Sequence, residues 1–158
     1  MEEIFTRMAA TGAWGSSETP CGPGSTIEAC RNILDRLPAW IRDHKIRSIA
    51  DLGCGDFHWM SLVDLAGVQY DGYDVVQFLI EKNVQRHGRD GVRFHHADLM
   101  TFAVPAVDLL VLKDVLIHLP TTQALEILGH ALGSHSKFIA STTSPGWPVT
   151  NRICMKVG

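Results

Sequence analysis

The sequence predicts an α/β fold in which helices cover both faces of a doubly wound, mostly parallel sheet. Short apolar runs alternate with amphipathic runs along residues 48–143, and this pattern is typical of chains in which strands and helices alternate. Most gaps between successive apolar runs are long enough for the crossover helices that parallel strands require. The chain has 158 residues, of which 46% are hydrophobic, and this is enough to fill the core of one domain.

Five strands and three intervening helices are predicted within this alternation. The strands are SIADL (48–52), VQYDGYDV (68–75), VRFHHADL (92–99), DLLVLKDV (108–115) and KFIASTT (137–143), and the helices are FHWMSLVDLA (57–66), VQFLIEKNVQRHG (76–88) and TTQALEILGHALG (121–133). The connection LMTFAVPAV (99–107) is too short for a full helix. One crossover is therefore expected to be abbreviated.

A further helix is expected to begin the domain, which we place at residues 25–145. Ser25 and Glu28 have the spacing of a capping box, and apolar residues recur at helical spacing to about His44. Pro38 is expected to bend or break the last turn, because its ring clashes with the preceding turn. Residues 1–24 are rich in glycine and proline near their end, and we expect an irregular arm there.

Composition and charge argue against several classes of partner. The net charge is −3, the isoelectric point is near 6.2, and the basic residues are scattered, so no basic stripe for nucleic acid is expected. The longest apolar stretch, residues 104–119, is interrupted by Asp108, Lys113 and Asp114, which indicates a buried strand region and no membrane contact.

Cysteine and histidine patterns bear on compartment and metal. The cysteines at 21, 30, 54 and 154 form no CxxC pair, and the first residues show neither a basic leader nor an apolar run. We therefore expect a cytoplasmic protein. His95 and His96 are adjacent on a predicted strand and point to opposite faces, so no metal site is expected.

Acidic residues end four of the predicted strands. Asp51, Asp74, Asp98 and Asp114 each stand at or just after the carboxyl end of a strand, where ligands of such sheets bind. This rim would repel phosphate and welcome a cationic ligand. The loop DLGCGDF (51–57) has two glycines, but His58 stands where a dinucleotide fingerprint needs a third.

Residues 48–118 resemble the cofactor half of the class I S-adenosylmethionine-dependent methyltransferases. The resemblance rests on four motifs in order, namely DLGCGDF, YDGYDVV, HHADLMTF and DLLVLKDVLIHLP. It implies a Rossmann-like domain, S-adenosyl-L-methionine as cofactor and methyl transfer to a small-molecule acceptor. This cofactor carries a sulfonium, an ammonium and a ribose diol but no phosphate, and so it suits the acidic rim.

The resemblance also implies a role for each motif position. Around the methionine part, Asp51 would orient the loop and receive the ammonium, while Gly53 and Gly55 would let the backbone approach, with the small Cys54 buried between them. Around the adenosine, Asp74 would accept the ribose hydroxyls, Val75 would lie against adenine, Asp98 would accept the adenine amino group and Leu99 would offer its backbone N–H to the adenine ring. Lys113 and Asp114 would line the floor near the reacting methyl.

Some positions leave two interpretations open. Asp98 could instead cap the turn that follows it. His118 could take a proton from an acceptor hydroxyl, or it could pack against or cap the helix that begins near Thr121. Trp14 and Trp59 could each be a core residue or part of a cover over the ligand.

The C-terminal end departs from the family pattern. A complete domain of this family has seven strands, the last two forming an antiparallel hairpin, and residues 146–158 are too few for these. Either the chain is a truncated or frame-shifted product, or a short single strand replaces the hairpin. The prediction of five strands leaves the fifth with an exposed edge, which would offer a contact for a homodimer.

Two other functions remain as alternatives. The chain could be a truncated cofactor-binding module without activity of its own. It could also be an NAD-type oxidoreductase, although His58 and the acidic rim disfavour a pyrophosphate ligand.

Overall fold

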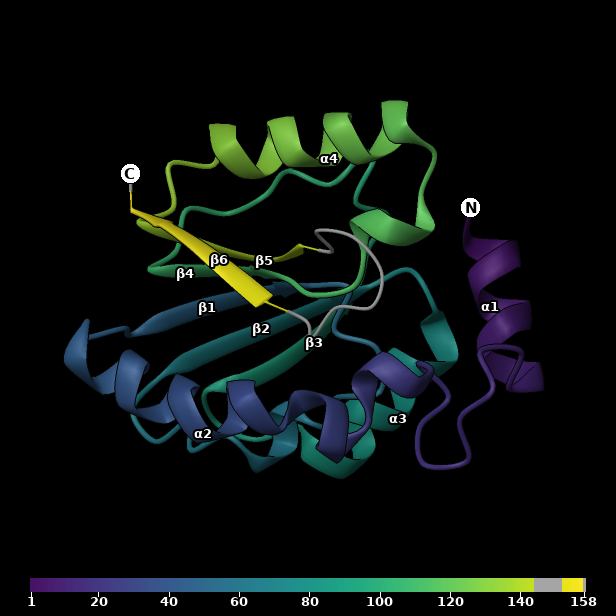
Figure 1. Cartoon of the computed structure of the whole chain (residues 1–158), viewed down its shortest axis with the longest axis horizontal. Helices are drawn as coiled ribbons and strands as arrows, with labels where there is room; N and C mark the ends of the chain where they lie inside the picture. Colours follow the sequence, from purple (N-terminus) through teal and green to yellow (C-terminus); the bar gives the residue numbers. More distant parts are fainter. Residues whose placement is uncertain (144–151, 158) are drawn as a thin grey trace.

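A computed structural model describes residues 1–143 and 152–157 of the chain, which include a six-stranded sheet (Figure 1). The strands are β1 (Ser48–Leu52), β2 (Gln69–Asp74), β3 (Val92–His96), β4 (Leu109–Leu112), β5 (Phe138–Thr143) and β6 (Arg152–Val157). Their order is β3-β2-β1-β4-β5-β6, with β1 to β5 parallel and β6 antiparallel to β5. The predicted α/β class and the five parallel strands are confirmed, and strand order reverses between β1 and β4.

Helices cover both faces of the sheet. Helices α2 (Ile27–Asp43) and α3 (Gln77–His87) lie on one face, and α4 (Thr121–Gly133) lies on the other (Figure 1). Alternate residues of β1 feed two different cores, since Ile49 packs on the side of α2 and Leu52 on the side of α4. The central strands are therefore buried on both faces, as strands of a parallel sheet usually are.

Helix α2 begins one residue later than the capping-box pattern predicts. Thr26 is its N-cap, and the Thr26 side chain accepts a hydrogen bond from the backbone N–H of Ala29. Ser25 instead ends a short 3-10 turn, Pro23–Ser25. The predicted break at Pro38 is wrong, because the helix continues through this residue to Asp43.

The N-terminal arm is less irregular than the sequence suggested. Residues Glu2–Thr11 form helix α1, so the prediction of an irregular arm over 1–24 is wrong for this part. The helix turns Phe5 and the buried Ala9 toward a cluster that includes Val76 and Leu79. Gly12 ends it in the left-handed conformation, with φ 64°, which is a common helix terminator.

The predicted helix over 57–66 is also wrong. Only Met60–Leu62 forms a 3-10 turn, and Phe57 before it has φ 58°. The buried residues of this segment are Phe57, Trp59, Met60, Val63 and Leu65. They do not repeat at the spacing of one helical face, so burial is achieved with a compact loop. The connection over 99–107 contains no helix, as predicted.

Strand β6 corrects the expectation about the sheet edge. It pairs with β5 from Phe138 to Thr143, so β5 does not have the exposed edge that was predicted. A single strand thus stands beside β5, which was one of the two alternatives. The predicted boundary between the domain and the tail, at 145/146, lies outside the described residues.

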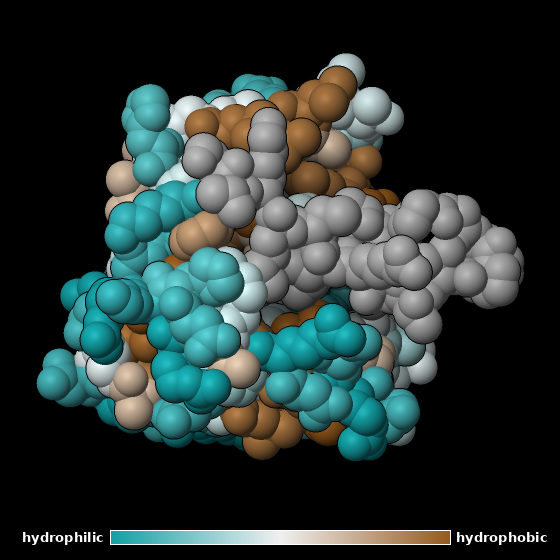
Figure 2. All heavy atoms as spheres, turned by 60° about the vertical axis from the view of Figure 1, so that its left-hand side comes forward, coloured by the Kyte–Doolittle hydropathy of each residue, from teal (hydrophilic) through white to brown (hydrophobic). Residues whose placement is uncertain are grey.

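Hydrophobic side chains gather over α4 on the surface shown in Figure 2. Leu125 and Leu132 are the most exposed large hydrophobic residues of this helix, at 63% and 55%.

Across residues 1–143 and 152–157, none of the helices has the length and apolar character needed to cross a bilayer.

Candidate functional site

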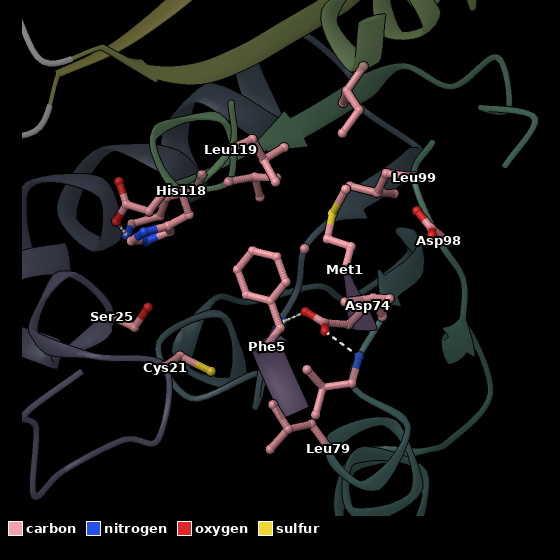
Figure 3. Close-up of a pocket in the computed structure, with 18 of the residues that line it drawn as sticks. Met1, Phe5, Cys21, Ser25, Asp74, Leu79, Asp98, Leu99, His118 and Leu119 are labelled. Atoms are coloured by element: carbon pink, nitrogen blue, oxygen red, sulfur yellow. Dashed lines mark hydrogen bonds and ion pairs between the residues drawn. The ribbon is translucent and has the colours of Figure 1, made fainter. Parts of the chain in front are cut away.

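A cavity lies at the carboxyl ends of β1 to β4, where strand order reverses. It holds about 790 Å³ of empty space, part of it open to solvent. Its wall consists of Met1, Phe5, Trp14, Cys21, Ser25, Gly53, Gly55, Asp74, Val75, Val76, Leu79, Asp98, Leu99, Lys113, Asp114, Val115, His118, Leu119 and Ile127. Figure 3 shows most of these side chains converging on one space. Nine of the eleven site residues predicted from the sequence are therefore brought together.

The glycine loop after β1 is held against β2. The backbone N–H groups of Gly53 and Cys54 donate to the carbonyl of Tyr73, at 2.7 and 3.0 Å. Gly53 has φ 82° and Gly55 has φ 56°, and L residues rarely adopt this region. The loop conformation thus requires glycine at both positions.

Packing adds a second reason for the two glycines. A Cβ at Gly53 would lie 2.3 Å from Cγ2 of Val115, and one at Gly55 would lie 2.5 Å from Sγ of Cys21. Protein side chains therefore occupy the space in which the sequence interpretation placed a ligand. The bare backbone still forms part of the cavity wall.

Asp74 is a buried carboxylate with a fixed orientation. Its Oδ2 accepts from the N–H of Gly55 and its Oδ1 from the N–H of Val76, both at 2.9 Å. Burial raises the pKa of Asp74, and these backbone hydrogen bonds oppose that rise. A carboxylate has about four lone-pair sites, so the two oxygens retain capacity for two further donors such as vicinal hydroxyls.

Asp98 caps the turn that follows it, which is one of the two interpretations left open by the sequence, and its contact with adenine stays a prediction. Its Oδ1 accepts from the N–H of Met100 at 2.9 Å, so it does cap the turn that follows β3. It also lines the cavity together with Leu99. The cap fixes the carboxylate at the wall and does not remove it from the site.

Lys113 and Asp114 form a buried pair at the end of β4. The ammonium of Lys113 donates to Asp114 and to the carbonyl of Gly24, the latter at 2.8 Å, and lies 5.8 Å from the ring centroid of Trp59. Asp114 has φ 56°, and its N–H donates to Oγ1 of Thr142 at 2.8 Å. The pair connects the floor of the cavity to the arm.

His118 lies on the wall beside the arm. Its ring centroid is 6.0 Å from that of Trp14. Partial burial lowers the pKa of His118, and the charge of Asp114 opposes this; a lowered pKa favours the neutral imidazole, which can accept a proton. The alternative role as a cap is not observed, since within the described residues α4 has Pro120 at its N-cap and no side-chain cap.

Asp51 and Cys54 are absent from the described wall of the cavity. Oδ2 of Asp51 accepts from the hydroxyl of Tyr70 at 2.7 Å, and burial raises the pKa of Asp51 to about 6. Cys54 is buried against Gly72 of β2. Both side chains hold the loop in place, and their contact with a cofactor stays a prediction.

The sequence left open that Trp14 belongs to a cover over the ligand, but it did not predict that helix α1 and Met1 form part of this cover. Phe5 of α1 and Met1, the N-cap of this helix, point into the cavity (Figure 3). Trp14 packs on Phe5 with 6.2 Å between ring centroids. The signals that could have revealed this helix are the apolar spacing within residues 2–11 and the terminator Gly12.

Polar contacts fasten the rest of the arm to the glycine loop. Oγ1 of Thr19 donates to Oδ2 of Asp56 at 2.9 Å, and Nε2 of His58 lies 2.8 Å from Oε1 of Glu18. The same Glu18 oxygen accepts from the N–H of Ile27 at 2.7 Å. The arm and the loop therefore form one unit.

No three His, Cys, Asp or Glu side chains in the described part of the chain lie close enough together to hold a metal ion.

Comparisons by sequence give no relative. No protein-family model matches the chain, and no curated protein is similar enough to count as a match.

Comparison with solved structures, in contrast, shows the fold. The chain is similar to the N-methyltransferase NodS from Bradyrhizobium japonicum WM9 in complex with S-adenosyl-L-homocysteine, with 16% identity, a TM-score of 0.68, and coverage of 89% of this chain and 71% of NodS. The chain has the class I methyltransferase fold. Its cavity corresponds to the strand ends at which the sequence motifs place the cofactor.

Two other neighbours are described as methyltransferases of other kinds. One is magnesium protoporphyrin IX methyltransferase (ChlM) from Synechocystis PCC 6803 with bound SAM, at 22% identity and TM-score 0.60, covering 74% of this chain and 60% of ChlM. The other is an O-methyltransferase family protein from Burkholderia thailandensis, at 20% identity and TM-score 0.61, covering 74% of this chain and 38% of that protein. The chain thus spans about 60% of the length of ChlM.

Proposed function

We propose that this protein binds S-adenosyl-L-methionine and transfers its methyl group to a small-molecule acceptor. The observation that carries the proposal is the cavity at the switch point of a class I methyltransferase fold, lined by the glycine loop and by the buried Asp74, which accepts a hydrogen bond from that loop. Neighbours with this fold were crystallised with S-adenosylmethionine or S-adenosylhomocysteine.

The residues of the cavity fit this cofactor. Asp74 has free lone pairs for the ribose hydroxyls, and charge-assisted hydrogen bonds of this kind are strong. Asp98 and Leu99 line the same cavity, which supports their proposed contacts with the adenine amino group and ring. Gly53 and Gly55 form part of the cavity wall, and the methionine part would lie against their backbone.

The chain's own residues would position the acceptor, exclude water from the cavity and accept a proton. The bound cofactor supplies an electrophilic methyl group on a sulfonium. Positioning of the acceptor in line with that group accounts for much of the rate in such displacements. Phe5 and Trp14 would exclude water from above, and neutral His118 would take the proton from an acceptor hydroxyl.

The experiment is a calorimetric titration of the folded chain with S-adenosylhomocysteine. The expected result is one binding site per chain, with no binding of NADH under the same conditions. A folded sample that binds NADH and not S-adenosylhomocysteine would support the oxidoreductase alternative and overturn the proposal.

A second candidate is a binding module that lacks activity of its own. The chain covers only about 60% of ChlM, so transfer activity stays a proposal for this chain. Labelled S-adenosylmethionine offered with a panel of hydroxyl-bearing and amine-bearing acceptors distinguishes the two. Tight cofactor binding without any transfer would favour the module.

A further inference from the structure

One polar group in the cavity wall has no partner. Within the described residues, the indole N–H of Trp14 is buried and makes no hydrogen bond. Buried Trp N–H groups usually find an acceptor, because leaving such a donor unpaired costs about 1 to 3 kcal/mol. Trp14 lines the cavity, so a ligand there could supply the acceptor.

Trp14 stands over the glycine-loop end of the cavity. Its Cβ is packed against Gly22, where an added Cβ would come within 2.8 Å. The neighbouring Cys21 lies against Gly55, and the indole ring is 6.0 Å from that of His118. These neighbours belong to the arm, to the loop after β1 and to the turn after β4, and this is the end that would receive the methionine part.

The two ends of the cavity differ in charge and in donors. The far end has the carboxylates of Asp74 and Asp98, which would repel an anion. The arm end has the Trp14 indole, the hydroxyl of Ser25 and the Lys113–Asp114 pair, whose opposite charges offset each other. Lys113 uses two of its three donors within the protein, so an anionic group finds several donors at this end.

We infer that the indole N–H of Trp14 donates a hydrogen bond to the carboxylate of the methionine part of the bound cofactor. The inference rests on the proposed function. Trp14 would then recognise the amino acid end of the ligand, because the carboxylate at that end is the one anionic group that this cofactor carries. Phe at this position would remove the donor and keep an aromatic ring beside Phe5, with a smaller packing volume than indole, and the second ligand in the test controls for this loss of packing.

The test compares two ligands on two variants. S-adenosylhomocysteine carries the carboxylate, whereas 5′-methylthioadenosine has the same adenosine and thioether without it. Trp14→Phe should weaken binding of S-adenosylhomocysteine about 10- to 100-fold, the range for a hydrogen bond to a charged group, and leave methylthioadenosine within about twofold. Trp40→Phe is the matched control, since Trp40 packs on His44 and Phe138, outside the described cavity wall; it should change neither affinity.

The outcomes separate this inference from the proposed function. If the unaltered chain binds no S-adenosylhomocysteine, the proposed function fails. If it binds but Trp14→Phe weakens both ligands equally, or neither, then Trp14 does not contact the carboxylate and the inference is wrong.

A second measurement uses the unaltered chain and so does not depend on the folding of the variant. The indole N–H resonance of Trp14, assigned through its proximity to Phe5, should move downfield when S-adenosylhomocysteine is added and much less with methylthioadenosine. Equal shifts with the two ligands would contradict the inference.

Discussion

The floor of the cavity and its cover are built in different ways. The floor consists of strand ends whose acids are fixed by nearby backbone groups, as Asp74 is by Gly55 and Val76. The cover consists of residues 1–26, which are fixed by side chains far away in sequence, as Thr19 is by Asp56 across 37 positions. The floor is thus a property of the sheet, whereas the cover depends on individual contacts that can be removed one at a time.

The largest expected effect is a loss of stability on substitution in the glycine loop of the cavity floor. Gly53→Ala should lower the free energy of unfolding by about 3 kcal/mol, because a Cβ would clash with Val115 and the residue would be strained at φ 82°. The control is Gly15→Ala, which has φ 75° but, among the described atoms, nothing within 4 Å of its added Cβ. It should lose only about 1 kcal/mol. Equal losses in urea unfolding would show that packing at the loop is unimportant.

The next effect concerns the ligand. Asp74→Ala should weaken binding of S-adenosylhomocysteine by about 1.5 to 3 kcal/mol, the scale of hydrogen bonds to a charged group. Asp71→Ala is the control on the same strand, since Asp71 pairs with Arg93 and stands outside the described cavity wall. An unchanged affinity in Asp74→Ala, measured by calorimetry, would remove this residue from the site.

The free energy of unfolding should depend on pH through Asp51, which lies beneath the cavity floor. The pKa of Asp51 is raised by burial to about 6, so its favourable contribution is complete below the unfolded pKa near 4 and is lost as pH rises through about 6. Asp51→Asn can still accept from Tyr70 and cannot ionise. Relative to the natural chain it should therefore gain about 2 kcal/mol in unfolding free energy between pH 4.5 and 7.5. A pH-independent difference between the two proteins would contradict the assignment.

The smallest effect should be confined to the cover. Thr19→Val removes the hydrogen bond to Asp56 and should cost about 1 kcal/mol. Amide hydrogen exchange should become faster in residues 12–22 and stay unchanged in β1 and β4. Faster exchange throughout the sheet would mean that cover and floor unfold together, which would contradict their separate stabilisation.

The same contrast explains what could be predicted from the sequence. The strands and the acids that end them follow from apolar periodicity and from local hydrogen bonds, so Asp74 and Asp98 were found correctly on the cavity wall. The capping position of α2 was displaced by one residue, since Ser25 and Thr26 both have the required side chain.

The cover could not be predicted in the same way. Whether Phe5 and Trp14 belong to a cavity depends on where the arm docks, and that depends on contacts with residues such as Asp56 and His58. The loop over 57–66 has many apolar residues, and only the packing around Phe57 shows that they form no helix. Asp51 has the right position in the motif, but its hydrogen bond to Tyr70 turns it toward the core.

The most direct test of the central claim is a crystal structure of the chain with S-adenosylhomocysteine. Both ribose hydroxyls should lie within hydrogen-bond distance of the Asp74 carboxylate, with the homocysteine part beneath the arm. A ligand bound outside this cavity, or one whose ribose makes no contact with Asp74, would contradict this claim.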